Sequence, residues 1–247
     1  MALGLASKGI AVLRYEKRTK QHGRKIAEDK TLTVKEETID DVVYAVKRLE
    51  KHPKIDNKKI YVLGHSLGGY LIPRIEKRDK KIAGFISLAG ATRDLEDIYL
   101  EQNTYFAKLD GHISMDEKAQ LYKLKKVVKK IKSLTNKDLD SPKVYLGLHP
   151  RYWVDLQGYE PAKEAVSIKK PFLILQGERD YQVTNTDFKI WQKELKDKKN
   201  VAFKMYPKLN HLFMPGEGTP SPADYKKTNH VEKQVIDDIA DWVLMKK

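Results

Sequence analysis

The chain has 247 residues, a length that suits one large α/β domain or two small ones. Its residues are 40% hydrophobic and 33% charged, which allows a sizeable core and excludes a disordered chain. The absence of cysteine excludes disulfides, cysteine–zinc sites and thiol nucleophiles. No run approaches 18 apolar residues, which excludes a membrane-spanning helix in this sequence.

The charge balance is basic, with 48 Lys and Arg against 34 Asp and Glu, a net charge of +14. The excess is spread along the chain: residues 1–30 carry 8 basic and 3 acidic side chains, and residues 99–165 carry 12 and 9. A protein that binds nucleic acid usually concentrates positive charge on one face and interleaves it with aromatic residues. The distribution therefore favours a solvated basic surface over a nucleic-acid partner.

Five short apolar runs, each bounded by charged or turn-forming residues, predict buried strands. Longer stretches with helical periodicity lie between them. This alternation predicts an α/β fold with a mainly parallel sheet flanked by helices on both faces. The predicted strands are Ile10–Leu13, Ile60–Leu63, Ile82–Leu88, Pro171–Leu175 and Val201–Tyr206.

Three stretches show helical spacing of their apolar residues. In residues 33–49 acidic side chains come early and basic ones late, as the helix dipole favours. Residues 121–134 have an apolar side and a lysine-rich side. We interpret the lysines as a solvated face, with an anionic membrane surface or nucleic acid as the alternatives. Residues 231–245 form the last predicted helix.

A polar, lysine-rich stretch of roughly 70 residues lies between the third and fourth predicted strands, too long for a structureless loop in a compact domain. Its helical periodicity predicts an inserted helical cap over residues 99–165. Residues 1–98 and 166–247 would then form the α/β core, interrupted by the cap.

The segment Gly64–Gly69 reads Gly-His-Ser-Leu-Gly-Gly and directly follows the strand predicted at Ile60–Leu63. A helical pattern comes next. In this context G-x-S-x-G is the pattern of a nucleophile elbow, in which a strained backbone holds the serine and small neighbours let strand and helix approach. Ser66 is therefore a candidate nucleophile at the carboxyl edge of the sheet. The alternative is a glycine turn with an idle serine.

A serine hydroxyl becomes a good nucleophile only with a base beside it. In folds that carry this elbow, the order along the chain is serine, acid, histidine, and the acid and the histidine lie on loops after later strands. Asp180 follows the fourth predicted strand, and His211 follows the fifth. Glu178 and His230 are rival candidates. Glu178 lies closer to the strand end, and His230 looks like part of the cap of the final helix. The histidines show no metal-ligand spacing such as H-E-x-x-H, so a catalytic metal is not expected.

These motifs together resemble the bacterial α/β-hydrolase esterases often described as dienelactone-hydrolase-like. The resemblance covers nearly the whole chain and implies an α/β-hydrolase fold. It also implies a serine esterase that acts on short acyl esters and uses no cofactor. The segments that carry it are Gly9–Tyr15, Gly64–Gly69, Tyr152–Leu156, Gly177–Val183 and Asn210–His211.

Residue by residue, the resemblance implies Ser66 as the nucleophile, His211 as the base and Asp180 as the acid that orients it. The backbone N–H of Leu67 would donate one hydrogen bond to the oxyanion. A small-molecule ester with a short acyl or aromatic group would be cleaved through an acyl-serine intermediate. The residues predicted to line the substrate pocket are His65, Tyr105, Tyr152 and Trp153.

The sequence departs from this family at its N-terminus. Family members carry about three further strands before the segment that opens this chain, so we expect an N-terminally truncated fold. Ile10–Leu13 would then lie beside Ile60–Leu63, or a second copy or another chain would complete the sheet, or the active form would be longer. The loop that supplies the second oxyanion donor is also missing, so we expect weak activity.

Three functions stay open on this basis. The first is a carboxylesterase, and the second an oligopeptidase- or thioesterase-like serine hydrolase with the same three residues. The third is a partner-dependent or inactive fragment. Residues 1–12 lack the basic start of a signal peptide and are interrupted by Lys8, and we expect a cytoplasmic location.

Overall fold

The computed structural model describes residues 1–245, the side chains of residues 24 and 27 excepted. The chain divides into two compact units. The first unit comprises Met1–Tyr15, Val43–Thr92 and the described chain from Pro161 onward, and the second comprises Glu16–Val42 and Arg93–Glu160. Helix α3 (Asp40–Glu50) begins in the second unit and continues in the first.

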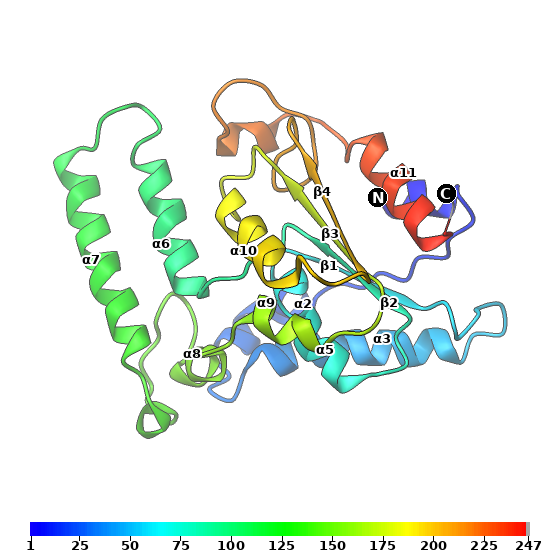
Figure 1. The fold of residues 1–247 in the computed structure, drawn as a ribbon. Coiled ribbons are helices and arrows are strands. Elements are labelled where there is room, and N and C mark those ends of the chain that lie inside the picture. The colour runs from blue at the N-terminus through cyan, green and yellow to red at the C-terminus, as the bar shows by residue number, and fades with distance from the viewer. Residues whose placement is uncertain (246–247) are drawn as a thin grey trace. The chain divides into compact units, whose positions relative to one another are not determined.

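The first unit is built on a four-stranded parallel sheet in the order β1-β2-β3-β4 (Figure 1). β2 and β3 are buried along their whole length, because each has a paired strand on both sides. In the register, Gly64 lies opposite Ser87, and Leu88 opposite Leu175. The strands are β1 (Tyr61–His65), β2 (Gly84–Leu88), β3 (Phe172–Gly177) and β4 (Val201–Tyr206).

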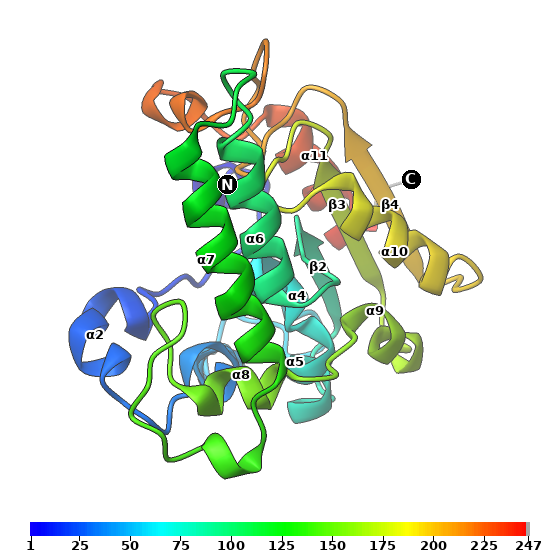
Figure 2. The same cartoon turned by 90° about the vertical axis from the view of Figure 1, so that its left-hand side faces the viewer.

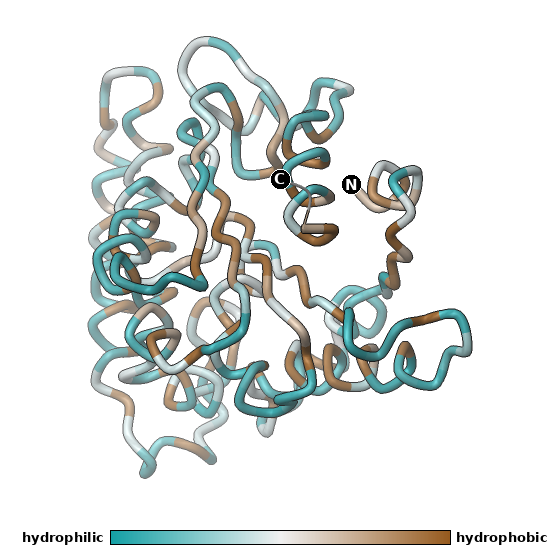
Figure 3. Tube along the Cα trace, turned by 45° about the vertical axis from the view of Figure 1, so that its right-hand side comes forward, coloured by the Kyte–Doolittle hydropathy of each residue, from teal (hydrophilic) through white to brown (hydrophobic). Residues whose placement is uncertain are grey.

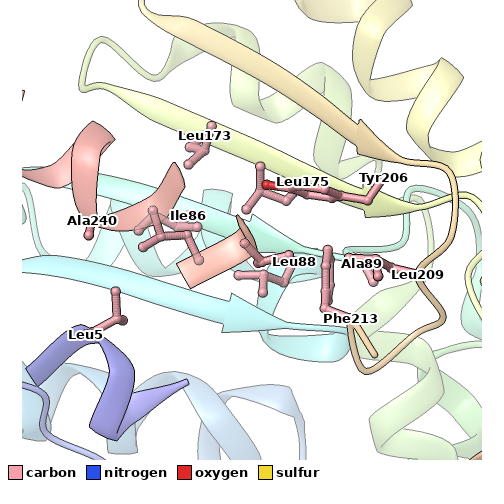
Figure 4. Close-up of a cluster of buried hydrophobic side chains, with 12 residues drawn as sticks. Leu5, Ile86, Leu88, Ala89, Leu173, Leu175, Tyr206, Leu209, Phe213 and Ala240 are labelled. Carbon is pink, nitrogen blue, oxygen red and sulfur yellow. The ribbon is translucent and has the colours of Figure 1, made fainter. Parts of the chain in front are cut away.

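Alternate side chains of these strands point to opposite faces of the sheet. On one face Leu88 and Leu175 belong to a buried cluster that also includes residues of α1 (Ala2–Ala6) and α11 (Lys233–Val243), as Figure 4 shows. On the other, the ring of Phe172 packs edge-on against Trp191 of α10 (Asn185–Leu195). The strands are hydrophobic along most of their length (Figure 3).

The shorter helical elements of the first unit lie between these strands or, in the case of Pro222–Lys226, between β4 and α11. They are α4 (Leu67–Tyr70), α5 (Ile72–Arg78), α9 (Pro161–Glu164) and the 3-10 turns Ala165–Ser167 and Pro222–Lys226. The predicted α/β architecture with a parallel sheet is thus confirmed, and so are four of its five predicted strands. The predicted helix at the end of the chain is confirmed as α11.

The strand predicted at Ile10–Leu13 is wrong. This segment has no strand structure, and Val12 and Leu13 are 41% and 42% exposed. Ile10 and Tyr61 of β1 both line a hollow of about 500 Å³. Within residues 1–245, β1 pairs with β2 alone. An apolar run becomes a strand only where a neighbour accepts its backbone hydrogen bonds, and local sequence does not supply that neighbour.

The second unit is helical in the part of the chain that the structure describes, and α6 and α7 lie side by side in it (Figures 1 and 2). The predicted lysine-rich helix is confirmed as α7, which begins with a capping box between Ser114 and Glu117. The predicted helix at 33–49 appears as a π-helical turn (Lys35–Ile39) followed by α3. The bounds of the helices in this unit are α2 (Arg18–Ala27), α6 (Leu95–Phe106), α7 (Met115–Lys132) and α8 (Pro150–Leu156), and a 3-10 turn lies at Asn136–Asp138.

Polar contacts join segments of the second unit that are distant in sequence. The Tyr152 hydroxyl donates to Glu37 Oε2 (2.5 Å), and Lys132 pairs with Asp97 (2.5 Å). Residues 16–42 thus share a unit with residues 93–160, which the sequence did not predict. None of the helices described in residues 1–245 has the length and apolar character to cross a membrane.

Candidate active site

Ser66 lies in the tight turn between β1 and α4, with φ 55° and ψ −117°. A non-glycine residue rarely adopts such a positive φ, so the surrounding structure must hold it there. The Ser66 N–H donates to Leu88 O (2.9 Å), and the Ser66 carbonyl accepts from the Tyr70 N–H (3.0 Å). These bonds anchor the turn to β2 on one side and to α4 on the other.

Two glycines allow the strand and the helix to approach at this turn. A Cβ added at Gly64 would lie 2.3 Å from the backbone carbon of Gly68, and one at Gly69 would lie 2.5 Å from Ser87 Oγ. A Cβ at Gly68 would meet no atom within 4 Å. The turn therefore requires glycine at positions 64 and 69 for steric reasons, whereas position 68 has free space.

Asp180 and His211 form a buried hydrogen-bonded pair. His211 Nδ1 and Asp180 Oδ2 are 2.7 Å apart, and each residue is 5% exposed. The carboxylate accepts in this bond, so Nδ1 carries a proton, and in the neutral ring the lone pair is on Nε2. Asp180 Oδ1 accepts the backbone N–H groups of Gln182 (2.8 Å) and Val183 (2.9 Å), which fixes the carboxylate. This arrangement orients the imidazole so that Nε2, the nitrogen not bonded to Asp180, is the one able to exchange a proton.

Gln176, the penultimate residue of β3, also holds this carboxylate. Its Nε2 donates to Asp180 Oδ2 (3.2 Å) and to the Val183 carbonyl (2.9 Å), and the residue is 1% exposed. Sequence reasoning missed Gln176, although a signal was present: it is a polar residue directly after the apolar run Pro171–Leu175 and precedes the acid by four positions.

The loop that carries His211 is organised by its neighbour Asn210. The Asn210 N–H donates to Met214 O (3.0 Å), and its Oδ1 accepts the N–H groups of Leu212 (2.9 Å) and Met214 (3.2 Å). Phe213 adopts a positive φ of 57° in the same loop. The backbone on both sides of His211 is therefore defined by local hydrogen bonds.

Arg179 connects the loop that carries Asp180 to the segment of residues 217–224. Its guanidinium donates to the carbonyls of Gly218 (2.6 Å) and Glu217 (3.0 Å) and lies 3.5 Å from the Asp224 carboxylate. In the same region Gln182 Nε2 donates to the Tyr225 hydroxyl (2.9 Å). Sequence reasoning did not single out these residues, because their partners lie about 40 positions away.

The rival acid and base stand apart from this network. Glu178 and His230 are both exposed, whereas Asp180 and His211 are buried and bonded to one another. Within residues 1–245, the Ser66 hydroxyl makes no hydrogen bond to the His211 imidazole. Such bonds are often long in enzymes without substrate and tighten when it binds.

His65, the residue before Ser66, lies against His211. Its Nε2 is 2.8 Å from the His211 carbonyl, and the two ring centroids are 4.5 Å apart with a 50° tilt. Part of the His65 side chain is exposed, but the surrounding protein lowers its pKa to about 4, mainly by loss of hydration and further through the nearby His211. His65 is therefore neutral at pH 7.

The other predicted pocket residues belong to the second unit. Tyr152 and Trp153 are buried there, and Trp153 Nε1 donates to the Tyr145 carbonyl (3.0 Å). Tyr105 is half-buried with its ring near that of Phe106. Leu67 is the first residue of α4, so its N–H lies in the turn where a helix offers no internal acceptor. In residues 1–245 no group of three or more His, Cys, Asp or Glu side chains is arranged to hold a metal ion.

Comparison with known proteins places this site in a family. The sequence profile of the prolyl oligopeptidase family matches residues 2–231. The chain belongs to this family. It is also 39% identical over 244 residues to esterase EstD of Thermotoga maritima, a match that covers 99% of this chain and 56% of the relative. The chain thus spans about half the length of this curated relative.

Two solved structures support the fold. An esterase of Pyrococcus furiosus is similar over 86% of this chain and 63% of its own, with a TM-score of 0.52 and 19% identity. An acylaminoacyl peptidase of Pyrococcus horikoshii is similar over 85% of this chain and 28% of its own, with a TM-score of 0.50 and 16% identity. With the parallel sheet and the family match, they establish the α/β-hydrolase fold that the sequence predicts.

Proposed function

We propose that this member of the prolyl oligopeptidase family is a serine hydrolase that cleaves carboxylic esters. The observation that carries the proposal is the buried Asp180–His211 hydrogen bond, with His65 joining His211 to the strained turn at Ser66. This arrangement supplies an oriented base beside a candidate nucleophile. The 39% identity to a named esterase supports an ester as the substrate.

In the proposed reaction His211 Nε2 takes the Ser66 proton while the serine oxygen attacks the ester carbonyl. The Leu67 N–H stabilises the resulting oxyanion. His211 then donates the proton to the leaving alcohol, and an acyl-serine remains. Water then attacks the acyl carbon while the same imidazole takes its proton, the bond to the Ser66 oxygen breaks, and His211 returns the proton to Ser66 as the acid is released. Asp180 holds the required tautomer and stabilises the imidazolium throughout.

The test combines turnover with labelling of the nucleophile. The wild-type chain is expected to hydrolyse p-nitrophenyl acetate and to react with a fluorophosphonate probe at one serine. Ser66→Ala abolishes both, whereas Ser7→Ala, at an exposed serine outside the proposed site, retains both. Labelling that persists in Ser66→Ala would refute the assignment of the nucleophile.

Peptide or thioester hydrolysis is the second candidate, because the family is that of prolyl oligopeptidase. The same three residues serve acyl transfer from esters, thioesters and amides. Matched p-nitrophenyl ester, thioester and p-nitroanilide substrates with the same acyl group separate these activities. A preference for the anilide would replace the esterase assignment. Absence of both turnover and labelling would favour a partner-dependent or inactive chain.

We further propose that residues 99–165 act as a cap that contributes Tyr105, Tyr152 and Trp153 to substrate selection. The proposal is supported by the separate compact unit that contains nearly all of these residues. Tyr105→Ala is the most direct test, since this side chain is half-buried whereas Tyr152 and Trp153 are buried. A change in preference between acetyl and benzoyl esters is expected, and an unchanged preference would contradict the role.

A further inference from the structure

His65 occupies the variable position of the Gly-His-Ser-Leu-Gly pattern, directly before the candidate nucleophile. Its side chain reaches a residue that is 146 positions away in sequence, the proposed base His211. A carbonyl oxygen can only accept, so His65 Nε2 must carry the proton and donate to the His211 carbonyl at 2.8 Å. The contact therefore defines one tautomer of His65.

The base is then held at two places. Asp180 binds Nδ1 of the His211 ring, which sets the rotation and the tautomer of that ring. His65 binds the His211 backbone carbonyl, and its ring lies beside the His211 ring. Asn210 shapes the same loop from within, through its bonds to Leu212 and Met214. The bond from His65 connects this loop to the turn at Ser66.

We propose that His65 is a positioning residue, which holds the base His211 at the distance and orientation that proton transfer from the nucleophile Ser66 requires. The proposal rests on the proposed function for its catalytic meaning. His65 and Ser66 are adjacent in the chain, so a hydrogen bond from His65 to His211 couples the two reacting residues across two loops. Errors of about 1 Å in such an arrangement cost roughly 100-fold in rate.

The charge of His65 matters for the same reason. Its ring centroid lies 4.5 Å from that of His211, which must become an imidazolium during each proton transfer. The Asp180 carboxylate, bonded to His211 Nδ1, is a further charged group that acts on His65, and it favours the protonated form of His65. A neutral His65 donates its hydrogen bond without opposing that positive charge, whereas a cation at this position would oppose it.

The positioning role differs from the pocket role that the sequence suggested for His65. A residue that contacts substrate changes KM and the preference among acyl groups. A residue that positions the base changes kcat by one common factor for all substrates, because every acylation and deacylation uses His211.

The test uses the full chain with His65→Phe, His65→Gln and the control His52→Phe, which alters an exposed histidine outside the site. His65→Phe keeps a ring and loses the donor. It is expected to lower kcat on p-nitrophenyl acetate and butyrate equally, by about 10- to 100-fold, with little change in KM. His65→Gln keeps an N–H donor and restores most of the rate, and His52→Phe matches the wild type.

His65→Lys adds a readout that a purely structural role would not move. The positive charge is expected to shift the acid limb of the kcat/KM profile to lower pH, while the limb of His65→Gln stays where it is in the wild type. An unshifted limb in His65→Lys would overturn the proposed proximity of this side chain to the base. Equal rates in His65→Phe and the wild type, or losses confined to KM, would overturn the positioning role.

A spectroscopic measurement tests the proposal without any substrate. The proton on His211 Nδ1, bonded to Asp180, is expected to give a low-field NMR resonance that His65→Phe weakens or shifts and His65→Gln preserves. An unchanged resonance in His65→Phe contradicts the positioning role. If the wild type fails to hydrolyse esters but the resonance responds as expected, the proposed function fails while the structural coupling stands.

Discussion

The two sides of the candidate site are held by different forces. On the nucleophile side, a strained backbone at Ser66 is maintained by close packing, with Gly64 and Gly69 in contact with backbone or buried atoms. On the acid–base side, Asp180 accepts four hydrogen bonds, and Asn210 organises the loop of His211. The first side is therefore sensitive to added volume and the second to lost donors and acceptors, and this contrast can be tested one side at a time.

The largest effect is expected from Asp180→Asn, which preserves the shape of the acid but favours the wrong tautomer of His211. We expect kcat to fall about 10⁴-fold with little change in the free energy of unfolding. The matched control is Glu178→Gln, an exposed residue two positions away, which should retain wild-type kcat. A loss in Glu178→Gln comparable to that in Asp180→Asn would reverse the choice of acid.

The packing side is tested by adding one methyl group. Gly64→Ala places a Cβ 2.3 Å from backbone atoms, so we expect about 3 kcal/mol of destabilisation, measured by urea unfolding. Gly68→Ala, in the same motif, places its Cβ in free space and should change the free energy of unfolding by less than about 1 kcal/mol. Equal effects of the two substitutions would show that close packing does not maintain this turn.

A second test of the acid–base side uses Gln176, where we expect a smaller loss of kcat than at Asp180. Gln176→Leu removes the hydrogen bonds to Asp180, Val183 and Gly177 and leaves a buried acceptor on Val183, so we expect a loss of about 1–3 kcal/mol in stability together with a lower kcat. Gln182→Leu is the comparison, because its side chain donates to Tyr225, whereas its bond to the carboxylate comes from the backbone N–H, which the substitution keeps. If thermal unfolding and kcat respond equally in both variants, Gln176 has no special role in holding Asp180.

The smallest effect concerns pH. The pKa of His65 falls from 6.5 to about 4 on folding, so the unfolded chain binds more protons between these values. Stability therefore decreases as pH falls from 6.5 towards 4. His65→Gln lacks this titration, so its Tm should fall less than that of the wild type between pH 6.5 and pH 4. Parallel Tm curves for the two proteins between pH 7 and 4 would contradict the lowered pKa.

Much of this molecule was predictable because the signals are local. The apolar runs of β1 to β4 and the glycine-flanked Ser66 depend on neighbours within a few residues. Asp180 and His211 could be proposed as partners since parallel strands bring their carboxyl ends to one edge of the sheet. The same reasoning failed for Ile10–Leu13, where an apolar run has no strand to pair with in the described chain.

By itself, the sequence determined the helical stretches at residues 33–49, 121–134 and 231–245, the strands β1 to β4 and the turn that bears Ser66, because residue size, polarity and spacing act over short distances. Only the tertiary structure decided that His65 meets His211, that Gln176 supports Asp180, and that residues 16–42 join residues 93–160 in one unit. Such contacts depend on which surfaces the folded chain brings together, and no periodic pattern in the sequence encodes them.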